Sequence, residues 1–393
     1  MTEHKNTPEL RFPEFKDEWI EYYLGNNAII KGRLGWKGLK QSEYLNNGYA
    51  YLIANKHIKN GRITWEETDQ INKFRYDESP EIALETGDLI FSKDGALGNP
   101  ALIKNLPKPA SINSTMMLVR LNKNNFIPNF FYQILLGPLF NKLIYLKVSG
   151  SSIPHLFQAD MKDFKFKAPS LPEQEKIGNF FSKLDQQIEL EEKKLELLEQ
   201  QKRGYMQKLF SQELRFKDEI GKVYPKWNLK KLKDIANVYQ PQNLSQNKFQ
   251  EKGYPVYGAN GVIGYYKEFN HSNMEIAIAC RGNTCGRVNL TEPKSWITSN
   301  AMVVNIIDKK EIDFYFLYQY LRIINYNNVI SGSGQPQITR KNMNSIELLV
   351  PKYVEQQKIG AFLTKYEELI KKQSSKVGLL KRRKQGLLQK MFV

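Results

Sequence analysis

Apolar side chains recur at spacings of three and four residues in two long stretches of the chain, a pattern that indicates one face of an α-helix. It predicts helices within residues 171–212 and 353–393. Each stripe is narrow and persists for about five heptads, which is typical of a coiled-coil seam. The first seam comprises Ile177, Phe181, Leu184, Ile188, Glu191, Leu195, Leu198, Lys202, Tyr205 and Leu209; the second comprises Ile359, Leu363, Tyr366, Ile370, Gln373, Val377, Leu380, Lys384, Leu387 and Met391.

The two stretches belong to an internal repeat. Residues 149–210 align without a gap to residues 331–392, with 22 identities in 62 positions. Upstream, Glu9-Leu10-Arg11-Phe12 recurs as Glu213-Leu214-Arg215-Phe216, and Trp19 recurs as Trp227. Between these anchors the halves differ. The chain is therefore predicted to consist of a variable block (1–170), a helix (171–212), a second variable block (213–352) and a second helix (353–393).

The two predicted helices are natural partners for each other. Residues 173–210 carry a net charge of −1 and residues 355–393 a net charge of +7. A direct repeat within one chain closes by a pseudo-two-fold axis, so we expect antiparallel pairing over a helix about 57 Å long. The alternative is that each helix packs only on its own domain.

Polar residues interrupt both seams at matching positions, and buried polar residues can fix the register of a coiled coil. Our hypothesis places Glu191 opposite Lys384, and Lys202 opposite Gln373. Glycine also recurs in both helices, at Gly178 with Gly360 and at Gly204 with Gly386. Because glycine weakens a helix interior, its recurrence suggests close backbone approach at these positions; the alternative is a surface glycine with no role.

The variable blocks have the pattern of mixed α/β domains. Short apolar runs at 88–91 and 275–279 predict strands, and aromatic-rich stretches at 129–146 and 314–324 predict helices. Ser170 and Glu173 have the spacing of a capping box at the start of the first long helix. Lys352 replaces the serine in the second copy.

Composition narrows the class of protein. The chain has 393 residues, enough for two ordinary domains, and a formal net charge of +17. Two cysteines, Cys280 and Cys285, exclude a disulfide framework and fit a reducing compartment. The sequence shows neither a run of apolar residues long enough for a membrane span nor the apolar core of a signal peptide. We therefore expect a cytoplasmic protein with no membrane partner.

The sequence holds no catalytic motif that we can recognise. A phosphate-binding loop, a dinucleotide fingerprint and an amino-methyltransferase motif are all missing. Cys280 and Cys285 lack a second pair of ligands, so neither a zinc site nor another metal site is expected. The E-x-K spacing at Glu292 is not preceded by Pro-Asp, so it predicts a surface turn rather than a nuclease centre.

The positive charge points to nucleic acid, because lysine and arginine neutralise phosphates while amide and guanidinium groups read base edges. The long helices account for +6 of the charge, leaving +11 for the variable blocks and their joints. The candidate DNA-binding residues of the first block are Arg33, Lys37, Lys40, Lys56, His57, Arg62 and Lys93. Those of the second block are Gln240, Gln242, Asn243, Asn260, Arg281, Asn283, Arg287, Ser299 and Asn300.

The whole chain resembles the specificity subunit of type I restriction-modification enzymes. The resemblance rests on the order and duplication of several modest motifs around the two helices. They are Leu10-Arg11-Phe12-Pro13 with Trp19, Gly87-Asp88-Leu89-Ile90, Pro172-Glu173-Gln174, Tyr254-Pro255-Val256-Tyr257-Gly258-Ala259-Asn260-Gly261 with Gly264-Tyr265, and Val354-Glu355-Gln356-Gln357-Lys358-Ile359. Val354 stands where the first copy has Pro172, a departure that concerns only the start of the second helix.

The resemblance implies a fold of two pseudo-repeated α/β (mixed α+β) target recognition domains, separated by two long helices that form an antiparallel coiled coil. Each domain would read one half of a bipartite DNA site, and the coiled coil would set the spacer between the halves. The subunit itself would be non-catalytic and hold no cofactor. It would bind two modification subunits, which use S-adenosylmethionine to methylate adenine, and two restriction subunits, which use ATP and Mg²⁺ to translocate and cut double-stranded DNA.

Three alternatives stay open at this stage. The chain could be an orphan, stand-alone DNA-binding protein without a restriction partner. It could be a nuclease or methyltransferase with an unrecognised active site, or an assembly scaffold whose basic charge is incidental. The two variable blocks differ too much for a palindromic target, so we predict an asymmetric one. Two readers on one face of B-DNA would lie about 34–36 Å apart.

Overall fold

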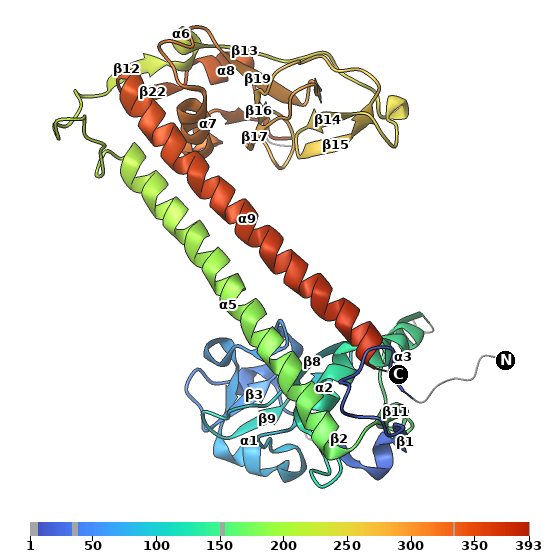
Figure 1. The fold of residues 1–393 in the computed structure, drawn as a ribbon. Helices are drawn as coiled ribbons and strands as arrows, with labels where there is room; N and C mark the ends of the chain where they lie inside the picture. The colour runs from blue at the N-terminus through green and yellow to red at the C-terminus, as the bar shows by residue number, and fades with distance from the viewer. Residues whose placement is uncertain (1–6, 34–37, 150–153, 333–334, 393) are drawn as a thin grey trace. The chain divides into compact units, whose positions relative to one another are not determined.

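A computed structural model describes residues 7–33, 38–149, 154–332 and 335–392. The chain divides into two compact units. Unit 1 comprises residues 1–192 and 376–393, and unit 2 comprises residues 193–375. Each unit therefore contains one variable block together with part of both long helices (Figure 1).

The described residues of unit 1 form two sheets of three or more strands. One has the order β2-β10-β7-β8 and the other the order β6-β3-β9, in which β3 and β9 are parallel. Its strands are β1 (Ile20–Tyr23), β2 (Ala28–Gly32), β3 (Ala50–Ile53), β4 (Ile58–Lys59), β5 (Arg62–Ile63), β6 (Gln70–Ile71), β7 (Leu89–Ser92), β8 (Gly98–Leu102), β9 (Ala110–Ile112), β10 (Met116–Leu121) and β11 (Lys165–Ala168). Its shorter helices are α1 (Lys73–Asp77), α2 (Pro128–Leu136), α3 (Pro138–Ser149) and α4 (Gln158–Lys162).

Unit 2 repeats this topology. One sheet has the order β13-β19-β16-β17 and another the order β15-β14-β18, in which β14 and β18 are parallel. Its strands are β12 (Asn228–Lys231), β13 (Ala236–Tyr239), β14 (Tyr254–Gly258), β15 (Gly261–Tyr266), β16 (Ile276–Ala279), β17 (Val288–Leu290), β18 (Trp296–Ile297), β19 (Ala301–Ile306), β20 (Ile330–Ser331), β21 (Gln337–Ile338) and β22 (Glu347–Val350). Its shorter helices are α6 (Leu232–Ile235), α7 (Phe314–Ile323) and α8 (Arg340–Asn344). The repeat therefore extends through the variable blocks, where the sequences have diverged.

Most of the elements predicted in the variable blocks are present. The strands predicted at 88–91 and 275–279 correspond to β7 and β16, and the helix predicted at 314–324 corresponds to α7. The helical stretch predicted at 129–146 is divided into α2 and α3 at Gly137. Pro138 explains the break, since proline cannot donate the backbone hydrogen bond that a continuous helix needs.

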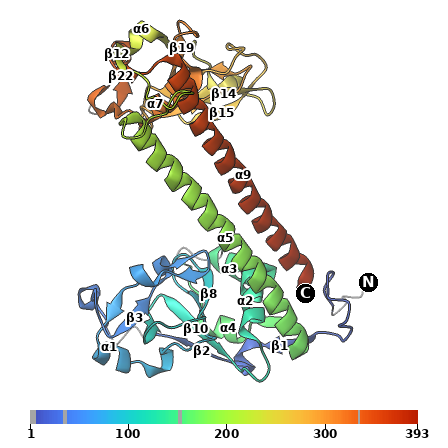
Figure 2. The ribbon, with the colours of Figure 1, turned by 60° about the vertical axis from the view of Figure 1, so that its left-hand side comes forward.

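The two predicted long helices are α5 (Leu171–Phe210) and α9 (Tyr353–Met391). In each unit their segments run side by side in opposite directions (Figure 1 and Figure 2). All twenty predicted seam residues are buried or half-buried, as the heptad pattern requires. The outer faces are polar, with exposed leucines such as Leu190, Leu197 and Leu379 among them.

The predicted pairing of polar seam residues is wrong. Lys384 pairs with Asp185 at 2.6 Å, and Lys202 pairs with Glu367 at 2.6 Å. Glu191 pairs with Lys376 instead of Lys384. Glu367 lies six residues before Gln373, or about 9 Å along the helix, so the true register differs from the hypothesis by roughly one heptad. A shift of one heptad leaves apolar residues facing apolar residues, so the apolar pattern could not exclude it.

Each long helix begins with the same buried anchor. Glu173 accepts two hydrogen bonds from Arg11, both at 2.7 Å, and Glu355 accepts from Arg215 at 3.1 and 2.7 Å. Glu173 therefore serves an ion pair rather than the predicted capping box. The next residue, Gln174, accepts from the backbone N–H of Ile127 and donates to the carbonyls of Asn125 and Pro169. Gln356 does the same with Asp313, Glu311 and Pro351.

The recurring glycines divide into two kinds. A Cβ at Gly178 would lie 3.0 Å from the backbone nitrogen of Phe130, and one at Gly360 would lie 2.9 Å from that of Phe316. Close approach is therefore confirmed there, where each helix packs on α2 or α7. At Gly204 and Gly386 a Cβ would meet nothing within 4 Å. The prediction of close approach is wrong at that second pair.

Candidate nucleic-acid interface

The loops at one end of the sheets in unit 2 bring together most of the polar residues predicted from sequence. Gln240 follows β13, and its Nε2 donates to the carbonyl of Ser299 at 3.1 Å. The N–H of Cys280, after β16, donates to the carbonyl of Asn300 at 3.0 Å, and that of Gly282 donates to Pro336 at 2.9 Å. In antiparallel order, the ends of β13 and β16 and the start of β19 meet at one edge. We call residues 240–243, 258–261, 280–283, 298–300 and 336–337 the loop edge of unit 2.

Two further bonds tie the remaining segments to this loop edge. The N–H of Thr298 donates to the carbonyl of Tyr257 at 2.9 Å, which places the β14–β15 turn beside residues 298–300. Trp296 Nε1 donates to the carbonyl of Gln242 at 3.3 Å. The turn carries Asn260 and ends at Gly261, whose φ of 89° favours glycine. Gln240, Gln242, Asn243, Asn260, Arg281, Asn283 and Asn300 are exposed and Ser299 is half-buried, so the loop edge presents amides and a guanidinium to solvent. Arg287, also exposed, lies just before β17.

Unit 1 builds the same loop edge from different residues. The N–H of Lys93 donates to the carbonyl of Thr115 at 2.9 Å, and that of Asn113 donates to Ile53 at 2.9 Å. These bonds match those made by Cys280 and Thr298 in unit 2. The loop edge of unit 1 comprises residues 54–57, 93–95, 113–115 and 154–155.

Equivalent positions of the two loop edges carry different chemistry. Asp94 stands where unit 2 has Arg281, and the segment after β3 carries Lys56 whereas the turn after β14 carries Asn260. Thr115 stands where unit 2 has Asn300, and His155 stands where it has Gln337. Asp94 is held between Lys93, at 2.6 Å, and His155. The scaffold is thus common to both units, and the side chains it presents are not.

The candidates predicted from the sequence do not include several residues of the loop edge in unit 1, namely Asn55, Asp94, Asn113, Thr115 and His155. A signal for some of them was present. Ile112-Asn113-Ser114-Thr115 matches Ile297-Thr298-Ser299-Asn300 in pattern, and His155 lies at the repeat offset from Gln337. Transferring the candidate positions of one variable block to the matching positions of the other block would have identified these residues.

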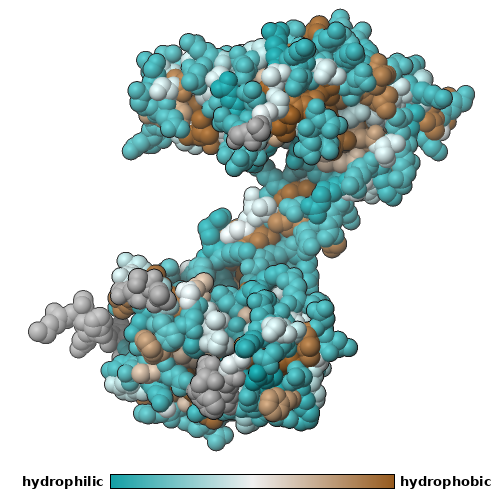
Figure 3. Space-filling model, turned by 180° about the vertical axis from the view of Figure 1, so that it is seen from behind, coloured by the Kyte–Doolittle hydropathy of each residue, from teal (hydrophilic) through white to brown (hydrophobic). Residues whose placement is uncertain are grey.

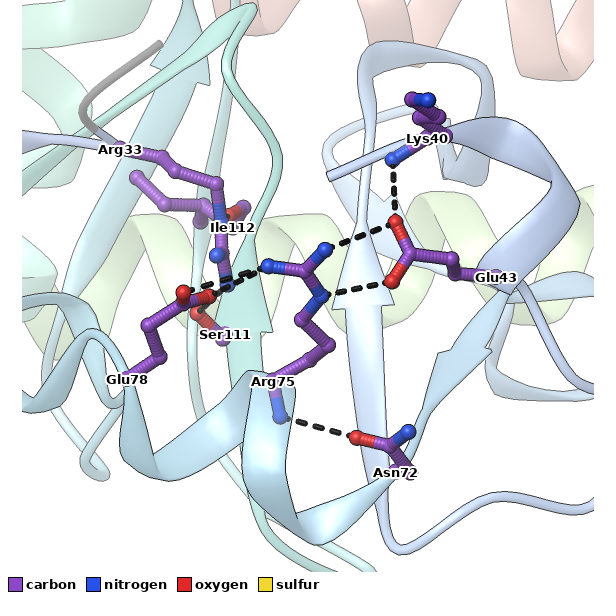
Figure 4. Close-up of polar contacts among 8 residues, drawn as sticks. All are labelled: Arg33, Lys40, Glu43, Asn72, Arg75, Glu78, Ser111 and Ile112. Carbon is purple, nitrogen blue, oxygen red and sulfur yellow. Dashed lines mark hydrogen bonds and ion pairs between the residues drawn. The ribbon is translucent and has the colours of Figure 1, made fainter. Parts of the chain in front are cut away.

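Arg33 is buried rather than available to DNA, and Figure 4 shows its side chain beside Ser111 and Ile112. Its side chain is 6% exposed; Nε donates to the carbonyl of Ile112 at 3.1 Å, and Nη2 donates to Ser111 Oγ at 3.3 Å. Burial lowers the pKa of this guanidinium. Beside it, Arg75 donates to both oxygens of Glu43 and to Glu78, which ties α1 to the segment after residue 37 (Figure 4). Arg33 therefore fixes the end of β2, and we remove it from the candidate interface.

His57 is also buried, with 1% of its surface exposed. Its Nδ1 accepts from the backbone N–H of Ala54 at 3.0 Å, and burial lowers its pKa. It shapes the turn before β4, and we remove it from the candidate interface as well. Lys40 and Lys56 are exposed, Lys93 is half-buried, and Lys37 lies outside the described residues. Arg62 is exposed but contacts α5 rather than the loop edge.

The described residues offer no metal centre: within them, no three His, Cys, Asp or Glu side chains gather closely enough to hold an ion. Burial raises the pKa of both Cys280 and Cys285, which leaves these thiols poor nucleophiles at neutral pH. In the parts of the chain that the structure describes, no helix has the length and apolar character to cross a membrane.

The fold and the two loop edges define a duplicated α/β scaffold that presents two different polar surfaces and is built on paired helices. A sequence model of the family described as "Type I restriction modification DNA specificity domain" matches residues 34–200 and again 224–378. The chain belongs to this family.

Known proteins agree with this assignment. The chain is 25% identical over 342 residues to the putative type I restriction enzyme MjaX specificity subunit of Methanocaldococcus jannaschii, covering 80% of this chain and 79% of that protein. It is 32% identical over 127 residues to the EcoprrI specificity subunit of Escherichia coli, covering 32% and 31%. The crystal structure of a type I system S subunit from M. genitalium superposes with a TM-score of 0.66 at 18% identity, covering 98% and 99%. That likeness confirms the predicted fold.

Proposed function

We propose that this chain is the DNA sequence-recognition subunit of a type I restriction-modification complex. Each unit reads one half of an asymmetric, bipartite site through its loop edge. The observation that carries the proposal is the duplication of one scaffold with different side chains at equivalent positions, such as Asp94 against Arg281 and Thr115 against Asn300. Amides and guanidinium groups on such loops suit the donor and acceptor pattern of the DNA major groove.

The chain does not catalyse a reaction in this proposal. Two modification subunits, using S-adenosylmethionine, methylate adenine, and two restriction subunits, using ATP and Mg²⁺, translocate and cut the DNA. The long helices dock these partners and set the spacer between the half-sites. Leu190, Leu197 and Leu379 of the long helices are exposed and are the contacts that we assign to these partners. Figure 3 shows apolar patches among polar residues on the surface, and such patches favour protein contacts.

The test is methylome sequencing of a host that carries this chain and its modification subunit, against a host without the chain. We expect new methyladenine at one asymmetric split motif. Replacing residues 214–351 by the corresponding block of a relative should change one half of the motif and leave the other. A mark that changes in both halves would contradict the proposal. If no mark appears and no modification subunit co-purifies, the chain acts as an orphan DNA-binding protein.

Arg281 offers a sharper test of the loop edge in unit 2. We expect Arg281→Ala to weaken DNA binding by the assembled complex by about 1–3 kcal/mol and to relax the sequence requirement in one half-site only. Methylation of a plasmid library randomised in both half-sites measures both effects. Lys231→Ala is the control, because Lys231 is exposed in the separate β12–β22 sheet. Equal relaxation in both half-sites would count against the assignment.

A further inference from the structure

An ion-pair cluster joins the helices of unit 2 to its recognition domain. The carboxylate of Glu367, on α9, accepts from Lys202 of α5 at 2.6 Å and also from Arg322 of α7. The Arg322 guanidinium lies over the ring of Tyr318, 5.3 Å from its centre. One carboxylate therefore holds both helices and the recognition domain together.

Unit 1 contains a matching cluster. Asp185 of α5 accepts from Lys384 of α9 at 2.6 Å. Arg62 of β5 reaches the same turn of α5, because its Nη1 pairs with Glu189 at 2.5 Å and its Nη2 donates to the carbonyl of Asp185 at 3.4 Å. The recognition domain thus contacts α5 within one helical turn of the Asp185–Lys384 pair, through the carboxylate of Glu189 and the carbonyl of Asp185.

The arginines that make these two contacts come from elements that do not correspond to each other in the repeat. Asp185 and Glu367 are repeat equivalents, as are Lys202 and Lys384. The arginines are not: Leu136 of α2 stands where α7 has Arg322, since Tyr132-Gln133 matches Tyr318-Gln319. Arg62 comes instead from β5, in the β4–β5 hairpin. In both units an arginine of the recognition domain thus pairs with an acid of a long helix beside a lysine–acid pair between the two helices, although the arginines and their acids differ.

The effect of these ion pairs follows from their position along the long helices. The start of each long helix is fixed in a core, in unit 1 by Glu173, Ile177 and Phe181. Asp185 lies twelve residues beyond Glu173, about 18 Å along the helix. Beside it an open pocket of ≈ 560 Å³ lies between the β4–β5 hairpin and the helices, and Arg62 reaches α5 at its wall. The ion pairs therefore give the recognition domain a second point of attachment to the helices, which restricts its rotation about the first.

We propose, on the basis of the function given above, that Arg62 and Arg322 are positioning residues for spacing. Each holds its recognition domain at one angle on the helix pair, and the complex therefore accepts one spacer length between the half-sites. These residues do not read bases. Their loss should broaden the accepted spacing and leave the sequence of each half-site unchanged.

The test measures methylation in cells that make the full chain with its modification subunit. A plasmid library carries the two cognate half-sites at the cognate spacing and at spacings one base pair shorter and longer. We expect Arg322→Met and Arg62→Met each to raise the ratio of off-spacing to cognate methylation about two- to fivefold, the range that a partly exposed ion pair supports. Arg322→Lys should restore much of the discrimination. Arg203→Met is the control, because Arg203 is exposed on α5 beside Lys202.

Each outcome bears on one claim. Because the ratio is taken within each variant, a lower amount of folded protein does not change it. An unchanged ratio in both methionine variants overturns the positioning role, and so does an equal fall in methylation at every spacing. Absence of methylation with the unaltered chain contradicts the proposed function instead.

Discussion

Replacing Arg215 by methionine should destabilise unit 2 by about 3–5 kcal/mol, because it leaves a buried carboxylate without its cation. Glu355 is 0% exposed and accepts from Arg215 at 2.7 and 3.1 Å and from Trp227 Nε1 at 3.2 Å. The remaining indole hydrogen bond cannot compensate for the lost charge. Denaturant unfolding followed by tryptophan fluorescence measures the loss, since Trp227 lies at the site.

A double-mutant cycle separates the ion pair from simple loss of side-chain packing. Glu355→Gln removes the buried charge, so Arg215→Met combined with Glu355→Gln should cost less than the sum of the two single changes. Lys217→Met is the control, because Lys217 is exposed close to Arg215 in sequence. Arg11→Met should have a similar effect in unit 1, where Glu173 is the buried partner. A change below about 0.5 kcal/mol at Arg215 would refute the argument, since surface substitutions have effects of that size.

The long helices were predictable because burial in a seam imposes a regular period that survives sequence divergence. Their register was not. Lysine at a seam position keeps its aliphatic stem buried and extends its ammonium to an acid beside the seam, as Lys384 does to Asp185. The hypothesis matched polar seam positions only with one another and so overlooked Asp185 and Glu367. Their contribution depends on side-chain length, which a heptad pattern does not record.

The candidate interface shows a similar limit. In unit 2 the candidates Gln240, Arg281 and Asn300 flank strand ends directly, and antiparallel order brings those ends together at one edge. Arg33 also follows a strand, yet its guanidinium points inward to backbone carbonyl and hydroxyl acceptors. Whether a basic side chain turns toward solvent or into the domain depends on tertiary contacts that no local pattern contains.

Lengthening both long helices by one heptad should abolish methylation at the original site and move activity to a spacer about three base pairs longer. Segment 195–201 directly precedes Lys202 and segment 368–374 directly follows Glu367, so the Lys202–Glu367 pair places these segments opposite each other. Duplicating both adds about 10.5 Å to each helix and keeps the seam in phase. Three base pairs of B-DNA span about 10 Å.

The original site should lose more than about a hundredfold in methylation, because a shift of three base pairs removes several base contacts worth roughly 1–3 kcal/mol each. The new site should be methylated less efficiently than the original one was. Three base pairs also rotate the DNA by about 100°, since B-DNA completes a turn in about 10.5 base pairs, and a heptad does not supply a matching rotation. Methylome sequencing reads both effects. Duplicating only segment 195–201 is the control. The apolar stripes can still face each other, but the Asp185–Lys384 and Lys202–Glu367 pairs cannot both form when α5 alone gains a heptad, so we expect no methylation at any spacing. If the double duplication kept the original spacer, the helices would not set the spacing.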